Sequence, residues 1–121
     1  MSGISLKQKF AGFDEYWTPK IVAELNNQYV KIAKFKGEFV WHSHLHEDEY
    51  FQVIKGTIEI HLRDKVVEIN EGEFYIVPKG VEHKPVAKQE AHVLMFEPKS
   101  TLQTGITDTV LKVEVADQQR I

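Results

Sequence analysis

The chain has 121 residues, of which 42% are hydrophobic and 27% charged, and its formal net charge is -3. This length suits one domain with a hydrophobic core of its own and is short for two. The mild acidity gives no reason to expect nucleic acid or an anionic membrane as a partner. Cysteine is absent, which excludes disulfides, thiolate metal ligands and cysteine nucleophiles, so any metal ion must be bound by nitrogen and oxygen.

The first 17 residues carry charges and two glycines but no apolar stretch of signal-peptide length. No later run approaches the length that spans a membrane. We therefore expect a cytoplasmic protein.

From about residue 20, short alternating segments rich in Val, Ile, Phe and Tyr are separated by Gly, Pro and charged turns, which is typical of an antiparallel sandwich or barrel. A short helical turn is expected within residues 13–26, ahead of or beside a first strand at residues 20–25. Further strands are expected at Tyr29–Phe35, Glu38–His44, Tyr50–Lys55, Thr57–Leu62, Lys65–Ile69, Phe74–Pro78 and His92–Glu97.

The C-terminal stretch Thr109–Val115 alternates again. It is expected to form an extra strand, one that a neighbouring subunit can share. The fold prediction is therefore an all-β, single-domain antiparallel barrel over residues 1–121, with its barrel core at about 20–98, a minor N-terminal helical turn and a C-terminal extension.

Histidines and acidic residues gather at the end of one predicted strand and in the stretch before the next: His42, His44, His46, Glu47, Asp48 and Glu49. Residues two apart on a strand point the same way with Cα atoms about 6.6 Å apart. His42 and His44 therefore offer two imidazoles on one face, as two ligands of one metal ion require. Glu49 lies an odd number of residues from His44, so the chain between them must turn or bulge if Glu49 is to join the pair.

A fourth candidate ligand lies downstream, where Gly72 opens a strand, Pro78 stops it and Gly80 allows the backbone to turn. His83 then begins the next strand. Such a turn can return its imidazole to the same cavity as the histidine pair.

Together these two stretches resemble the two motifs of the cupin superfamily: a Gly, a His-x-His pair, a Glu, six residues and a Gly, and later a Gly, five residues, Pro-x-Gly, two residues and a His. The resemblance runs from about Gly37 to Pro98, and the chain looks like the small single-domain bacterial cupins. It implies a jelly-roll barrel with one divalent transition metal (Mn, Fe, Ni, Co, Cu or Zn) bound by His42, His44, Glu49 and His83. Two positions depart from the family pattern: the first Gly is one residue closer to the His pair, and Ala87 stands where an Asn is often found.

Other candidates stay open beside these four. His46 shares the strand parity of His42 and His44 and is an alternative ligand, although a place at the rim is favoured. Glu47 and Asp48 are rival carboxylates, but only Glu49 leaves six residues before Gly56. His61 is expected on the surface and His92 in a structural role.

Strand periodicity also predicts which side chains face the pocket. With His42 inward, Phe39 and Trp41 are expected on the outer face, covered either by the N-terminal segment with Tyr16 and Trp17 or by a second subunit in a homodimer.

The pocket is expected to be mostly apolar and to take a small organic ligand. The leading functional hypothesis is a metal-dependent enzyme acting on a small metabolite, as an oxygenase, isomerase, lyase or cyclase. The alternative is a non-catalytic binding or sensing module, and no catalytic residue apart from the metal ligands is identified.

Overall fold

The computed structural model describes residues 2–99 and 117–121. In this part of the chain there is one short helix, and no helix has the length and apolar character needed to cross a membrane. The elements are α1 (Leu6–Ala11), β1 (Lys20–Leu25), β2 (Gln28–Glu38), β3 (Glu49–Lys55), β4 (Thr57–Leu62), β5 (Val66–Asn70), β6 (Phe74–Val77) and β7 (His83–Pro98).

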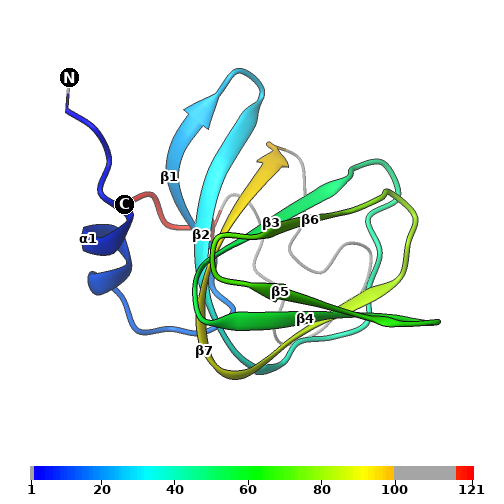
Figure 1. The fold of residues 1–121 in the computed structure, drawn as a ribbon. Helices are drawn as coiled ribbons and strands as arrows, with labels where there is room; N and C mark the ends of the chain where they lie inside the picture. The colour runs from blue at the N-terminus through cyan, green and yellow to red at the C-terminus, as the bar shows by residue number, and fades with distance from the viewer. Residues whose placement is uncertain (1, 100–116) are drawn as a thin grey trace.

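The strands form one strongly curved antiparallel sheet in which β7 is the central element (Figure 1). The first part of β7 pairs with β4, and its second part pairs with β3. Strand β2 pairs with β7 along nearly its whole length, with a register shift between Phe35 and Gly37. The order β1-β2-β7-β3-β6, with the β4–β5 hairpin attached to β7, folds the sheet into a jelly-roll barrel, as the sequence predicts.

The interior of the barrel is filled by alternate residues of these strands. In β3, Glu49, Phe51 and Val53 are buried while the residues between them are partly exposed. This alternation is what period two requires of a strand with one face toward a core. The same pattern in β7 buries Val93 and Met95.

One predicted strand is wrong. Strand β2 ends at Glu38, and residues 39–48 form no strand apart from a single bridge between His42 and His83. The side chains of Phe39 and His42 both line one cavity, although they are three residues apart. A regular strand would place them on opposite faces, so the period-two rule fails for this segment.

The consequence for Phe39 is that it lies inside the protein. Its side chain is 7% exposed and stacks on Trp17 with ring centroids 4.9 Å apart. Trp17 therefore provides the cover that the sequence led us to expect, but within the core and not on an outer face. Trp41 is partly exposed, and the guanidinium of Arg63 lies 3.8 Å from its ring centroid.

Helix α1 and the described C-terminal residues lie on the side of β1 and β2 (Figure 1). The helical turn expected within residues 13–26 does not form there. The short helix lies upstream, at Leu6–Ala11, with the Ser5 hydroxyl accepting from the Gln8 amide as an N-cap. The described C-terminal residues run along β1, where the Ile21 amide donates to the Gln119 carbonyl and the Ile121 amide donates to the Ile21 carbonyl. The predicted strand at 109–115 lies outside the described residues.

Candidate metal centre

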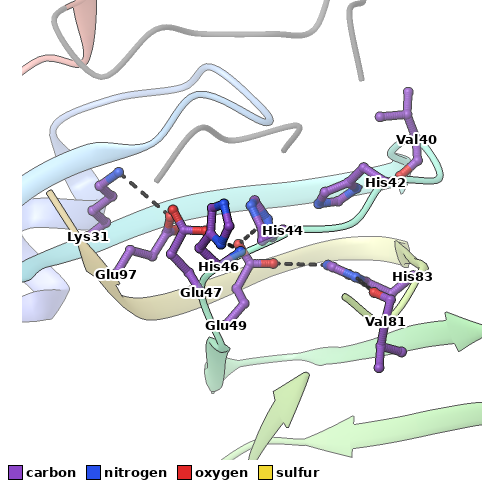
Figure 2. A network of polar contacts seen from close by, with 10 residues as sticks. All are labelled: Lys31, Val40, His42, His44, His46, Glu47, Glu49, Val81, His83 and Glu97. Carbon is purple, nitrogen blue, oxygen red and sulfur yellow. Dashed lines mark hydrogen bonds and ion pairs between the residues drawn. The ribbon is translucent and has the colours of Figure 1, made fainter. Parts of the chain in front are cut away.

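Four buried side chains come together in the structure: His42, His44, Glu49 and His83 (Figure 2). Each is at most 4% exposed, and each offers a ligand atom within 4.8 Å of the others. They come from three parts of the chain, since two lie in the irregular segment 39–48 and the others are the first residues of β3 and β7. These are the four residues that the sequence analysis predicted as metal ligands.

Backbone hydrogen bonds bring the two motifs together. The His42 amide donates to the His83 carbonyl at 3.0 Å, and the His83 amide donates to the His42 carbonyl at 2.9 Å. The Gly80 amide donates to the His44 carbonyl at 2.8 Å, with Gly80 at a φ of 79°. A positive φ is unfavourable for residues with a Cβ, so glycine suits the turn that returns His83 to the histidine pair.

Two of the imidazoles are oriented by backbone carbonyl groups. Nδ1 of His42 lies 2.9 Å from the Val40 carbonyl oxygen, and Nδ1 of His83 lies 3.0 Å from that of Val81. A carbonyl oxygen can only accept, so Nδ1 carries the proton in both rings. In the neutral rings Nε2 is then left with its lone pair, as a metal ligand must be.

The contacts of Glu49 fit a bound cation. Its Oε1 lies 3.0 Å from Nε2 of His83, and its Oε2 lies 3.0 Å from Nε2 of His44. The second contact is short but does not have the direction of a hydrogen bond, and the buried Nε2 of His44 has no hydrogen-bond partner among the described residues. Two donor atoms bound at about 2.1 Å to one ion are about 3 Å apart when their bonds meet near a right angle. The residues present therefore fit a metal ion with nitrogen and oxygen ligands.

Electrostatics favour the ligating form of two of these groups. Burial lowers the pKa of His42 to about 4, which keeps this ring neutral at pH 7. Burial opposes ionisation of Glu49, but His44 and His83 outweigh it and hold the pKa of Glu49 below its ordinary value. Burial also acts to lower the pKa of His44, yet the Glu49 carboxylate has the larger net effect and raises it. Since a divalent ion repels protons from its ligands, metal binding competes with the proton on His44.

The other candidates from the sequence are not members of this cluster of four. His46 is exposed, and Asp48 accepts a hydrogen bond from the Lys79 amide at 2.9 Å. Glu47 is partly exposed and lies close enough for its charge to act on the pKa of His44. His61 is partly exposed and lies 2.9 Å from Glu59. His92 packs its ring on Phe10 with centroids 4.4 Å apart, in the structural role that was predicted.

A narrow cavity of about 20 Å³ adjoins the cluster, enough for one water-sized molecule. His42 and Glu49 form its polar wall. Its other walls are mainly apolar, as expected, and come from Trp17, Pro19, Ala33, Phe35, Phe39, Phe51, Pro85 and Met95.

Sequence reasoning missed a second polar group in this cavity. Glu97, at the end of β7, lines it, and Lys31 on β2 lies 3.8 Å from Glu97. Both positions share strand parity with buried apolar residues, since Glu97 follows Val93 and Met95 at spacing two. The sequence could have revealed both residues, because each is a charged residue at an inward-facing position of a predicted strand.

Comparison with known proteins agrees with this geometry. The family model described as Cupin domain matches residues 28–97. The uncharacterized protein YdbB of Bacillus subtilis is 32% identical over 80 residues, which span 65% of this chain and 65% of that protein.

Two crystal structures have the same fold. A cupin-2 domain containing protein from Shewanella frigidimarina is 45% identical with a TM-score of 0.78, covering 78% of this chain and 93% of that one. A protein from Neisseria meningitidis is 30% identical with a TM-score of 0.74, covering 80% of this chain and 99% of that one. The family match covers more than half of the sequence and includes both motifs around the four buried ligands. The chain belongs to the cupin family.

Proposed function

We propose that the protein is a metal-dependent enzyme acting on a small organic metabolite, with one divalent transition metal bound by His42, His44, Glu49 and His83. Three neutral imidazoles and one carboxylate leave a site of net charge about +1 with a divalent ion. Such a donor set suits Mn, Fe, Co, Ni, Cu or Zn better than Ca or Mg, which prefer oxygen ligands.

The observation that carries this proposal is the convergence of four buried ligand atoms, which all lie within 4.8 Å of one another. Burying such polar groups costs folding free energy unless they are paired or coordinate a metal ion, and one ion shared by all four removes that cost. When bound, the ion supplies Lewis acidity, or redox chemistry if it is a redox-active metal, to a ligand oxygen. The chain's own part is to hold the imidazoles by their Nδ1 groups and to surround the site with aromatic side chains.

The alternative is a non-catalytic module that holds a small metabolite beside the same four side chains. The cavity next to the metal centre supports both an enzyme and a binding module over a purely structural ion. Turnover of a metabolite by metal-loaded protein would distinguish an enzyme from a binding module. A homodimer is a further prediction, argued in the Discussion.

The metal site is tested by comparing His44→Ala with His61→Ala after loading with Mn, Fe, Ni or Zn. The parent protein is expected to hold close to one equivalent, and His44→Ala to hold markedly less and to melt at a lower temperature, because an ion bound only by the folded state stabilises it. His61→Ala removes a histidine outside the cluster and should change neither value. Parent protein that never approaches one equivalent, or His44→Ala that binds as tightly as the parent, contradicts the assignment.

A further inference from the structure

A second cavity lies on the outside of the barrel, between helix α1 and the sheet. It has a volume of about 480 Å³, and its walls include Lys7 and Phe10 of α1, Lys34 of β2, Ile54 and Lys55 of β3, and His92 of β7. We call it the α1 groove. Ala33 and Val93 belong to the barrel interior. Their neighbours in sequence, Lys34 and His92, therefore point to the outer face of the sheet, and the α1 groove is separate from the candidate metal centre.

Lys34 is a buried cation without a carboxylate beside it. It is 8% exposed, and its ammonium donates to the Phe13 carbonyl and lies 5.0 Å from the centroid of the Phe13 ring. The buried lysines Lys20 and Lys31 differ, because Nζ of Lys20 lies 3.1 Å and Nζ of Lys31 lies 3.8 Å from a carboxylate oxygen. Among residues 2–99 and 117–121, Lys34 forms no ion pair of this kind.

The surroundings of Lys34 compensate its burial only in part. A buried ammonium costs free energy unless a counter-charge and hydrogen-bond acceptors are supplied. The ammonium has three protons to donate, and the Phe13 carbonyl accepts one of them. The charge of Glu90 interacts with Lys34 at longer range, but its two carboxylate oxygens contact the Tyr16 hydroxyl at 2.7 Å and Nε2 of His92 at 2.9 Å. An anion supplied by a ligand would complete the environment of Lys34.

The rest of the α1 groove combines positive charge with apolar surface. Lys55 is exposed and lies in register with His92, and Lys7 is exposed on α1. One carboxylate, that of Glu71, lines the groove against these two lysines and Lys34, so the groove is locally positive in a chain of net charge -3. Its apolar surface includes Phe10, whose ring stacks on His92 with centroids 4.4 Å apart. The groove therefore suits a molecule that is both anionic and apolar.

We propose that the α1 groove binds a small organic carboxylate with an apolar chain or ring, its carboxylate against Lys34 and its apolar body on Phe10 and Ile54. Lysine ammonium groups act as compact charges and need no bidentate geometry, and hydrogen bonds from an ammonium to a carboxylate are stronger than those between neutral groups. A volume of about 480 Å³ is in the range of pockets that hold small molecules. This site is independent of the proposed metal centre.

The test measures ligand binding to the full chain by isothermal titration calorimetry at pH 7. Octanoate is compared with 1-octanol, and 2-naphthoate with 2-naphthol, because each pair shares an apolar body and differs in charge. The carboxylate of at least one pair is expected to bind about tenfold tighter than its alcohol or more, as hydrogen bonds to charged groups allow. Acetate, which lacks the apolar body, should bind more weakly than that carboxylate by a similar factor. The pair that shows the preference identifies the ligand as a chain or a ring.

Variants assign this preference to the α1 groove. Lys34→Met removes the buried cation and should abolish the preference for the carboxylate over the alcohol. Lys55→Glu reverses an exposed charge at the groove, leaves the core intact and should weaken carboxylate binding severalfold. Lys65→Glu is the matched control, since it makes the same change of charge at an exposed position between β4 and β5; it should bind as the parent does. His44→Ala alters the metal centre and should also keep the preference.

Three results overturn the inference. The first is a parent protein that binds neither carboxylate more tightly than its alcohol. The second is carboxylate binding as tight as the parent's in both Lys34→Met and Lys55→Glu, and Lys55→Glu alone decides this point if Lys34→Met does not fold. The third is a preference that is lost in folded His44→Ala, which would place the carboxylate at the metal centre, or an equal loss in Lys65→Glu, which would make it an effect of net charge alone.

Discussion

At the scale of single residues, the most unusual group in the barrel is Glu97. Burial, and then the nearby Glu49 carboxylate, raise the pKa of Glu97 to about 7. Between pH 4.5 and 7 the folded protein therefore keeps a proton that the unfolded chain has released. The contribution of Glu97 to stability is present at low pH and is lost as pH rises through this window. A difference of 2 to 3 pKa units corresponds to a few kcal/mol.

This predicts a pH dependence that can be removed by substitution. Metal-free parent protein and Lys31→Met/Glu97→Gln are unfolded with urea at pH 5 and pH 8. The parent should lose about 3 kcal/mol more of its unfolding free energy than the variant between these values. The double substitution avoids leaving Lys31 without a partner, and His42, which titrates near pH 4, is present in both proteins. The same pH dependence in both proteins would show that Glu97 titrates normally.

The sequence identified the four candidate metal ligands because the spacing between them follows a recognisable pattern. The interval from His44 to Glu49 and the Pro78-x-Gly80 turn before His83 are local patterns, and the structure brings these residues together. Lys31 and Glu97 were missed because each is an ordinary charged residue in a strand. Only the pairing of β2 with β7 places one beside the other.

At the scale of elements, the strands in which apolar and polar residues alternate regularly were predicted with nearly correct bounds. The strand at Thr57–Leu62 is β4 itself. Residues 39–44 were misassigned as strand because the first of them, Phe39 to Trp41, have high strand propensity. Their backbone instead follows the contacts of His42 with His83 and of His44 with Gly80, which no local pattern encodes.

The turn at Gly80 should therefore matter for metal binding as well as for folding. Gly80→Ala places a Cβ at a φ of 79°, which costs about 1–2 kcal/mol, although no atom lies within 4 Å of that Cβ. Relief of this strain should shift the hydrogen bond from the Gly80 amide to the His44 carbonyl, and with it His83. We expect lower metal affinity as well as lower stability, measured by metal titration and urea unfolding.

Gly72→Ala is the matched control for this prediction. Gly72 has a φ of 84° with equally open space around its Cβ, but its amide donates to the Val53 carbonyl, away from the metal cluster. It should show a similar loss of stability with metal affinity unchanged. Equal effects of the two substitutions on metal affinity would mean that the Gly80 turn has no special part in placing His83.

At the scale of the whole molecule, the family and the jelly-roll fold were predicted from sequence. Of the arguments for a homodimer, the need to cover Phe39 on an outer face fails, and the edge strand at 109–115 lies outside the described residues. Phe39 needs no second subunit, because Trp17 and Phe35 enclose it within the chain. The single domain over residues 1–121 stays a prediction, with the described strands running from Lys20 to Pro98. The homodimer also stays a prediction and needs a different surface.

Strand β6 offers that surface. It is the last strand in the order of the sheet, and two of its apolar side chains face outward: Phe74 is 59% exposed and Ile76 is 46% exposed. Phe74 stacks on Tyr50 with ring centroids 5.0 Å apart, which extends the apolar area onto β3. An edge strand with exposed apolar side chains is prone to pair with another chain, and a second copy in a symmetric dimer covers the same patch on both subunits.

We therefore expect the parent protein to sediment as a dimer at micromolar concentration, and Phe74→Lys to sediment as a monomer that still binds metal. In a symmetric dimer the two introduced lysine side chains would be buried against each other, and burying two like charges strongly disfavours the dimer. Leu25→Lys is the control, since Leu25 is 54% exposed at the end of β1, the strand at the opposite end of the sheet order. A parent protein that is already monomeric contradicts the dimer, and dissociation by Leu25→Lys but not by Phe74→Lys would move the interface from β6 to β1.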